Sequence, residues 1–251
     1  MILKKLKGIK LKQHIYNLAF FPLVLLNSQP RDFINRYPVY IFHHIPKCAG
    51  TSTIFALRHW FFIVKDYWSS YYPEEVPYFI QHPVKLRFLR SYNCLCGHFD
   101  LPETHLDKRY REVLHNQKFK IFTFIRDPLE LKISLYHFEK KRGNREGISL
   151  AQHLLERTNF IASVLNCTLD NYQGVLDRYF FIGISEYLQS SMDKLAVMCN
   201  KRKVKLFVLN KSQRDAKLSD IPLALINQFK TKNQLDYRIY EYCLKKFREN
   251  S

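Results

Sequence analysis

The chain is short of acidic residues. Its 251 residues include 40 Lys and Arg but only 22 Asp and Glu, which gives a formal net charge of +18 at pH 7 and an isoelectric point near 9.6. A field of this size attracts polyanions and speeds their encounter, but it does not identify them. Nucleic acid, an anionic membrane, an acidic polysaccharide and a polyphosphorylated cofactor all fit, as does a solvated basic surface without a partner.

The apolar run near the N-terminus is too short to cross a membrane. It covers residues 15–26 and is interrupted by Asn17 and Pro22, whereas a membrane-spanning helix needs about 20 apolar residues. No small-residue cleavage site follows the run, which weakens its interpretation as a signal peptide.

The sequence before and around this run is basic. Five lysines and no acid occupy the first twelve residues, with Ile2, Leu6 and Ile9 on one helical face. We expect residues 1–36 to form a basic amphipathic and apolar segment, with residues 1–26 in contact with a membrane surface or packed against the domain. A signal anchor remains the alternative.

Metal-site spacing is missing among the six cysteines. Cys94 and Cys96 form a C-x-C pair, but no second pair completes a tetrahedral zinc site, so the sequence predicts no metal. Glycine is scarce as well: there are only seven, and no internal repeat or low-complexity stretch is visible. With 47% hydrophobic residues, residues 37–251 can form one core.

Apolar runs that end in turns predict strands, and apolar residues at helical spacing predict helices. The predicted strands are residues 37–46, a short segment within 92–101 that ends at Gly97-His98, residues 119–125, 179–185 and 203–210. The predicted helices begin at Thr51 (with Ile54, Leu57 and Phe61 on one face), after Asp127, near Glu186 to Cys199, and around Leu235, Ile239 and Tyr242. Residues 67–83 are predicted to be an irregular excursion. This alternation indicates an α/β fold of three layers, with a central, mainly parallel sheet flanked by helices.

The third predicted strand leads into a helix with strong start signals. Asp127 suits the N-cap, Pro128 suits the first helical position and Glu130 would complete a capping box. Leu131, further along, lies on the apolar stripe of the same helix.

The sequence IPKCAGTS (residues 45–52) joins the first predicted strand to a helix and has the features of an anion site. Backbone N–H groups of a first helical turn, together with the helix dipole, favour a phosphate there. Gly50 allows close approach, Thr51 and Ser52 offer hydroxyls, and Lys47 adds a full charge. An ordinary strand-to-helix turn remains the alternative for this segment taken alone.

The spacing differs from that of an ATP- or GTP-binding Walker loop, G-x-x-x-x-G-K-[ST]. Lys47 precedes Gly50 instead of following it, and no glycine lies four or five residues upstream of Gly50. We therefore expect a phosphate cradle of another family, without the usual magnesium ligand.

Two motifs in order resemble those of the PAPS-dependent carbohydrate sulfotransferases, the group that includes heparan sulfate 2-O-sulfotransferase and bacterial relatives. IPKCAGTS resembles their 5′-phosphosulfate loop, and FIRDPLELKISLYHF (residues 124–138) is similar to their 3′-phosphate motif, R-D-P-x-x-R-x-x-S-x-Y. Weaker likeness at residues 97–99, 180–195 and 208–212 extends the resemblance over roughly residues 40–247. It implies a P-loop-like fold, with residues 37–251 as the sulfotransferase domain.

The resemblance also implies roles for individual residues. The co-substrate is 3′-phosphoadenosine 5′-phosphosulfate (PAPS), and Lys47 would offset charge on its leaving 5′-phosphate. The loop that would hold this phosphate comprises Lys47, Cys48, Ala49, Gly50, Thr51 and Ser52. Arg126 and Ser134 would bind the 3′-phosphate, and a guanidinium suits that task because it grips phosphate bidentately. A pair between Arg126 and a nearby acid, and a buried helix hydroxyl at Ser134, are the alternatives.

The sequence departs from the family pattern at two positions. Leu131 stands where an arginine is common, and Lys132 could replace that cation only by curling around the helix. His98 matches the histidine of the family's G-H motif, the proposed general base, and an imidazole suits that task near neutral pH. A structural histidine that bonds a backbone carbonyl is the alternative. Some relatives have a second histidine two residues earlier, where this chain has Cys96, and His43 and His44 are interpreted as structural.

The leading hypothesis is therefore a PAPS-dependent carbohydrate O-sulfotransferase that needs no metal and acts on an acidic glycan, with Lys140, Lys141 and Arg142 as a possible basic rim. A nucleotide-dependent kinase of related P-loop ancestry and a non-catalytic polyanion-binding protein are the alternatives. No nucleic-acid motif is recognised. We expect a cytoplasmic or peripheral membrane location, with a Golgi-type lumenal one as the alternative; the oligomeric state stays open.

Overall fold

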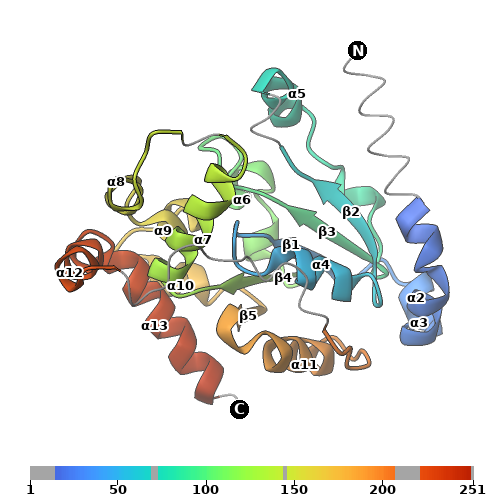
Figure 1. Ribbon diagram of the computed structural model, residues 1–251. Helices are drawn as coiled ribbons and strands as arrows, with labels where there is room; N and C mark the ends of the chain where they lie inside the picture. Colours follow the sequence, from blue (N-terminus) through green and yellow to red (C-terminus); the bar gives the residue numbers. More distant parts are fainter. Residues whose placement is uncertain (1–14, 69–72, 144–145, 207–220, 250–251) are drawn as a thin grey trace.

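The computed structural model describes residues 15–68, 73–143, 146–206 and 221–249. Its centre is a five-stranded sheet in which every strand pair is parallel, in the order β2-β3-β1-β4-β5 (Figure 1). The strands are β1 (Val39–His43), β2 (Phe62–Asp66), β3 (Asn93–Gly97), β4 (Phe119–Ile125) and β5 (Phe181–Ile184). The α/β fold with a central parallel sheet flanked by helices, predicted from the sequence, is thus confirmed.

The central strands are buried on both faces. All five residues of β1 are buried, and six of the seven residues of β4 are buried too. Continuous apolar runs of this kind, without alternation, are typical of a parallel sheet covered on both sides. His43 faces Tyr179 on one side of the sheet, and its neighbour His44 lies against Gly50 on the other.

Helices occupy both faces and the two edges of the sheet. The longer ones are α4 (Gly50–Leu57), α7 (Pro128–Lys140), α11 (Leu188–Met198), α12 (Leu223–Lys232) and α13 (Gln234–Glu249). The shorter ones are α2 (Phe21–Asn27), α3 (Pro30–Ile34), α5 (Val76–Gln81), α6 (Leu106–Arg109), α8 (Leu150–Leu155), α9 (Phe160–Leu165) and α10 (Tyr172–Leu176). Single 3₁₀ turns are η1 (Pro73–Glu75), η2 (Leu86–Phe88), η3 (Val113–His115) and η4 (Ser185–Tyr187). Helices α11 and α13 pack against β5 at one edge.

Most predicted elements are found, and three regions differ from the prediction. β1, β3, β4 and β5 lie within the predicted strands, and β4 matches its prediction end to end. The helix expected to include Phe61 ends at Leu57, and a strand that was not predicted, β2, begins at Phe62. The excursion expected to be irregular contains η1 and α5. Residues 203–206 form no strand, and the rest of that predicted strand lies outside the described residues.

The described part of the N-terminal segment packs against the β2 edge. Residues 15–19 are helical, and the Asn17 amide donates to the Ile63 carbonyl at 3.3 Å. The Phe21 and Phe62 rings stack with centroids 5.9 Å apart. Within the described ranges no helix combines the length and the apolar character that a membrane span requires. The predicted amphipathic face of Ile2, Leu6 and Ile9 lies outside them.

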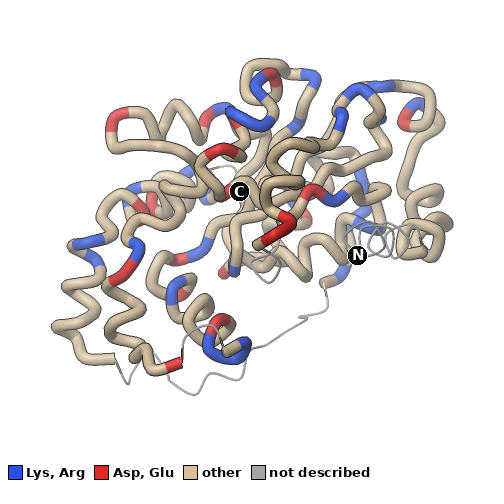
Figure 2. The backbone as a smooth tube through the Cα atoms, turned by 90° about the horizontal axis from the view of Figure 1, so that it is seen from above, with Lys and Arg blue, Asp and Glu red and all other residues tan. Residues whose placement is uncertain are grey.

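Basic residues are distributed over the whole molecule. Lys and Arg occur along nearly every part of the chain, with Asp and Glu among them (Figure 2). The excess of positive charge therefore does not by itself mark a site, and local geometry has to do so.

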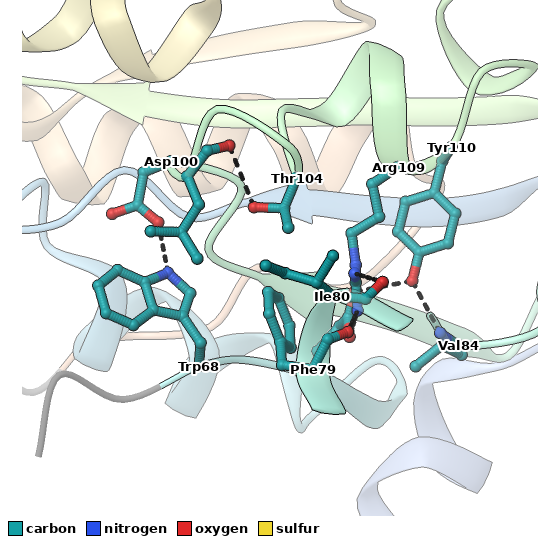
Figure 3. A network of polar contacts seen from close by, with 10 residues as sticks. Trp68, Phe79, Ile80, Val84, Asp100, Thr104, Arg109 and Tyr110 are labelled. Atoms are coloured by element: carbon teal, nitrogen blue, oxygen red, sulfur yellow. Dashed lines mark hydrogen bonds and ion pairs between the residues drawn. The ribbon is translucent and has the colours of Figure 1, made fainter. Parts of the chain in front are cut away.

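A buried ion pair fixes the end of β2 and the α5 segment. Arg109 donates to both carboxylate oxygens of Asp66 at 2.6 and 2.8 Å and also to the carbonyls of Phe79 and Ile80 (Figure 3). The Tyr110 hydroxyl donates to Asp66 at 2.7 Å. Because the two charges are almost wholly buried, removing either partner would leave the other unpaired, which costs about 3–5 kcal/mol.

Candidate active site

The functional elements gather at the carboxyl edge of the sheet, around the loop after β1. The chain leaves β1 toward β2 on one side and leaves β4 toward β5 on the other, so the connections diverge between β1 and β4. Such a switch point is where open α/β sheets bind ligands. The predicted phosphate loop, residues 45–52, lies at this point and leads into α4.

The backbone of the loop is shaped for an anion. Lys47 (φ 66°) and Ala49 (φ 58°) are left-handed, which is uncommon for residues with a side chain, and α4 starts directly afterwards at Gly50. Turns with alternating handedness direct successive N–H groups into one concavity that suits an anion. Within the described ranges no protein acceptor bonds the N–H groups of Lys47, Ala49, Gly50, Thr51 or Ser52. These donors are the ones that a bound phosphate could satisfy.

Cys48 differs from its neighbours in the loop. Its side chain is 1% exposed, its N–H already donates to the Ile45 carbonyl at 3.3 Å, and burial raises the pKa of its thiol far above the usual range. The residue therefore packs into the core and holds the loop in shape. Of the predicted hydroxyls, Thr51 is exposed and Ser52 is 6% exposed.

Lys47 belongs to a cluster of cations beside α7. Its ammonium lies 4.1 Å from the centroid of the Phe138 ring, and the Arg142 guanidinium lies 4.0 Å from the same centroid. Burial lowers the pKa of Lys47, and the charges of Arg126 and Arg142 lower it further. Because these three cations repel one another, an anion bound among them would be stabilised by all three.

Arg126, the first residue after β4, reaches the loop directly. Its Nη1 donates to the Lys47 carbonyl at 3.4 Å, and its Nη2 pairs with Glu130 at 2.9 Å. The nearby acid that the sequence left open as a partner is thus Glu130. The pair is partly exposed, so a phosphate could compete for the guanidinium.

Ser134 is 8% exposed on α7, and no hydrogen bond links its hydroxyl to Arg126 or to the loop within the described residues. Leu131 is buried in the main core, as its place on the apolar stripe predicts. Lys132 does not replace the missing arginine. Its ammonium donates to the Glu156 carbonyl at 2.7 Å, beyond the end of α8.

The start of α7 confirms the predicted N-cap, with one change in its partners. The Asp127 carboxylate accepts from the Glu130 N–H at 3.0 Å, with Pro128 as the first helical residue. The reciprocal bond of a capping box is absent, because the Asp127 N–H donates to Glu186 at 2.9 Å. The Glu130 side chain is used for Arg126 instead.

On the other side of the loop, three side chains meet because of strand register. His43 pairs with Gly97, and Gly97 pairs with Asp66, so the next residues, His44, His98 and Tyr67, stand level at three adjacent strand ends. His98 Nε2 lies 3.1 Å from His44 Nδ1, and the Tyr67 hydroxyl lies 3.1 Å from the same atom.

Burial keeps both imidazoles of this group uncharged. It lowers the pKa of His98, an effect that the Asp100 carboxylate partly opposes. The pKa of His44 is lowered further, by burial first and then by His98, His43 and Lys47. Of the two, His98 is the better proton acceptor at neutral pH, which suits the predicted general base.

Gly50 connects the loop to the histidine pair. A Cβ at this position would lie 1.7 Å from Nε2 of His44, so only glycine lets the imidazole pack against the start of α4. Gly50 thus affects both the conformation of the predicted phosphate loop and the position of His44 beside the predicted base.

The sequence interpretation missed His44 and Tyr67 as members of this site. His44 was interpreted as structural, and Tyr67 was placed in an irregular segment because β2 was not predicted. Cys96 is buried on β3 with its sulfur 3.8 Å from that of Cys94, so the second imidazole comes from β1 instead. The pairing of β1 with β3 brings the two imidazoles together, since His44 and His98 each directly follow their strand. In the described part of the chain, no three His, Cys, Asp or Glu side chains gather as a metal site would require.

Comparison with known proteins gives little beyond the geometry. No family model matches the chain, and no curated protein matches its sequence. Among solved structures, a sulfotransferase from Alicyclobacillus acidocaldarius is similar with a TM-score of 0.48 and 13% identity, over 83% of this chain and 96% of that one. A likeness at this level does not assign an activity to the chain.

Proposed function

We propose that this protein transfers the sulfuryl group of PAPS to a hydroxyl of a carbohydrate acceptor. One observation carries the proposal: Arg126 reaches the phosphate loop from the β4 side, while His98 approaches from the β3 side. A donor with two phosphate groups and an acceptor that must lose a proton need this division of cations and base.

In the proposed mechanism the loop N–H groups, with Thr51 and Ser52, hold the 5′-phosphate. Arg126, with Ser134, holds the 3′-phosphate, and Lys47 offsets the charge that grows on the leaving oxygen. Preorganised donors of this kind contribute about 3 kcal/mol each to stabilisation of a transition state. Sulfuryl transfer resembles phosphoryl transfer, a reaction in which positioning of the reactants and neutralisation of charge dominate catalysis.

His98 acts as the general base. Its neutral imidazole takes the proton of the acceptor hydroxyl while the acceptor oxygen bonds to sulfur and the bond from sulfur to the 5′-phosphate oxygen breaks. The products are a sulfate ester and adenosine 3′,5′-bisphosphate. His44 and Tyr67 keep the His98 ring in position.

The direct test is conversion of PAPS to adenosine 3′,5′-bisphosphate by the purified protein with a glycan acceptor. We expect transfer, with Lys47→Ala and His98→Ala each abolishing it. His115→Ala and Lys245→Ala, exposed residues on η3 and α13, are the matched controls. Full activity in both site variants would contradict the assignment.

The parallel sheet with a phosphate loop at its switch point also suits a nucleotide-dependent kinase. A thermal shift separates the two functions. Stabilisation by adenosine 3′,5′-bisphosphate that exceeds that by ATP with magnesium supports sulfuryl transfer, and the reverse order supports the kinase.

A further inference from the structure

A cavity of about 410 Å³ opens beside the histidine pair. Its walls come from α4, from the ends of β1, β2 and β3, and from the N-terminal helical residues. Thr51 of the phosphate loop and His98 both line it. The volume lies within the range of about 300–1,000 Å³ that small-molecule sites occupy.

Arg58, which also lines this cavity, is a buried cation with no acidic partner among the described residues. It is 6% exposed, and its Nη1 has no hydrogen-bond partner among the described residues. Its guanidinium lies against the Tyr16 ring, 4.7 Å away, and the more distant Phe20 ring. Burial lowers the pKa of Arg58, and no carboxylate of the described residues offsets this effect. A buried charge with no counter-ion is costly, so an anionic ligand here would relieve it.

Lys65 adds a second cation to the same wall. It lies on β2 two residues before Tyr67, so the two side chains leave the same face of the sheet. Lys65 is exposed, but partial desolvation of its ammonium and the Arg58 charge lower its pKa, and no described carboxylate offsets this. The cavity is thus lined by two mutually repelling cations and by the proposed base.

We propose that this cavity is the acceptor subsite and that it selects a sugar bearing an anionic group, with that group at Arg58 and Lys65 and the reactive hydroxyl at His98. The inference rests on the proposed function, because it identifies the cavity as the place where the acceptor binds. The Tyr67 ring, whose centroid lies 4.6 Å from that of His98, provides an aromatic surface of the site.

The test uses two acceptors that differ in one group, 4-nitrophenyl β-glucuronide and 4-nitrophenyl β-glucoside. We expect kcat/KM for transfer to favour the glucuronide by about tenfold, the effect of one charge-assisted hydrogen bond. Lys65→Met and Arg58→Met should each reduce this preference, by lowering transfer to the glucuronide more than transfer to the glucoside. Lys245→Met, an exposed lysine on α13, removes the same charge elsewhere and should change nothing. The kcat/KM for a 6-sulfated glucoside, compared with that for the glucuronide, shows whether the site prefers a carboxylate or accepts any anionic group.

Ligand-observed NMR with the same two compounds, in the presence of adenosine 3′,5′-bisphosphate, separates this inference from the proposed function. Selective binding of the glucuronide that Lys65→Met weakens would support the subsite even if no sulfuryl transfer occurred. Transfer with an unchanged preference in Lys65→Met and in every folded Arg58 variant would overturn the subsite and leave the function standing. Lys65 is exposed, so its variant keeps the test valid if Arg58→Met does not fold.

Discussion

The two sides of the phosphate loop contrast in how they handle charge. On the β4 side, Lys47, Arg126 and Arg142 present permanent cations around unbonded backbone N–H groups. On the β3 side, His44 and His98 are kept neutral by burial. An anionic leaving group needs the first environment, and removal of a proton needs the second. A single strand, β1, is enough to separate the cationic environment from the neutral one.

Gly50→Ala is the single change expected to disturb both sides of the loop at once. The new Cβ would overlap the His44 ring, which must then move away from His98 or push the loop aside. We expect transfer to fall on the order of 10²–10³-fold, as for the loss of a preorganised donor. Kinetics with PAPS and a glycan acceptor measure it.

The double variant Gly50→Ala/His44→Gly sharpens the comparison by removing the clash. Binding of adenosine 3′,5′-bisphosphate, measured by calorimetry, should recover while transfer stays low. Recovery of both would show that His44 does not support the base.

Substitutions within the histidine pair should have unequal effects. His98→Gln removes the base and should lower kcat about 10²–10⁴-fold. His44→Gln removes one hydrogen bond to the base and should lower kcat roughly five- to tenfold. Neither should alter donor affinity. Equal losses in the two variants would mean that the pair acts as one unit, with His44 as important as His98.

Arg126→Lys tests the opposite side. An ammonium keeps the charge but cannot grip two phosphate oxygens, so affinity for adenosine 3′,5′-bisphosphate should drop about tenfold. Affinity for adenosine 5′-phosphate, which lacks the 3′-phosphate, should change little. Calorimetry with both nucleotides gives the ratio, and Arg248→Lys on α13 is the control. An unchanged ratio would remove Arg126 from the 3′-phosphate site.

The smallest expected effect is a shift in pH dependence. His98 must be neutral to act, so the rate should fall as pH drops through its pKa, which burial places below 6.5. Lys47 must be protonated, so the rate should also fall as pH rises through a pKa that burial and two arginines place below 10.5. Asp100→Asn removes a charge that raises the pKa of His98 and should move only the acid limb to lower pH. Movement of the alkaline limb instead would contradict the assignment, and Asp170→Asn is the control.

The sequence predicts one side of this site much better than the other. The β4 side follows from local signals: an uninterrupted apolar strand, Asp127 as the N-cap and Pro128 after it. The β3 side depends on β2, which was hidden because Phe61 continues the helical spacing of Ile54 and Leu57. The early end of α4 reflects tertiary packing, since Trp60 and Phe61 are buried. Without β2, Tyr67 and Lys65 had no predicted place, and His44 was missed because the predicted strand of residues 37–46 extends past it.

The level arrangement of Tyr67, His98 and His44 has a consequence for how such a protein can diverge. Each of these residues stands at the first position beyond its strand. The strand pairing therefore ends just before the side chains to which the proposed function assigns the chemistry. Replacement at these positions can redirect the chemistry while the architecture is inherited unchanged. Under the proposed function, related proteins with the same sheet can therefore differ in the acceptor that they use while they keep the same fold.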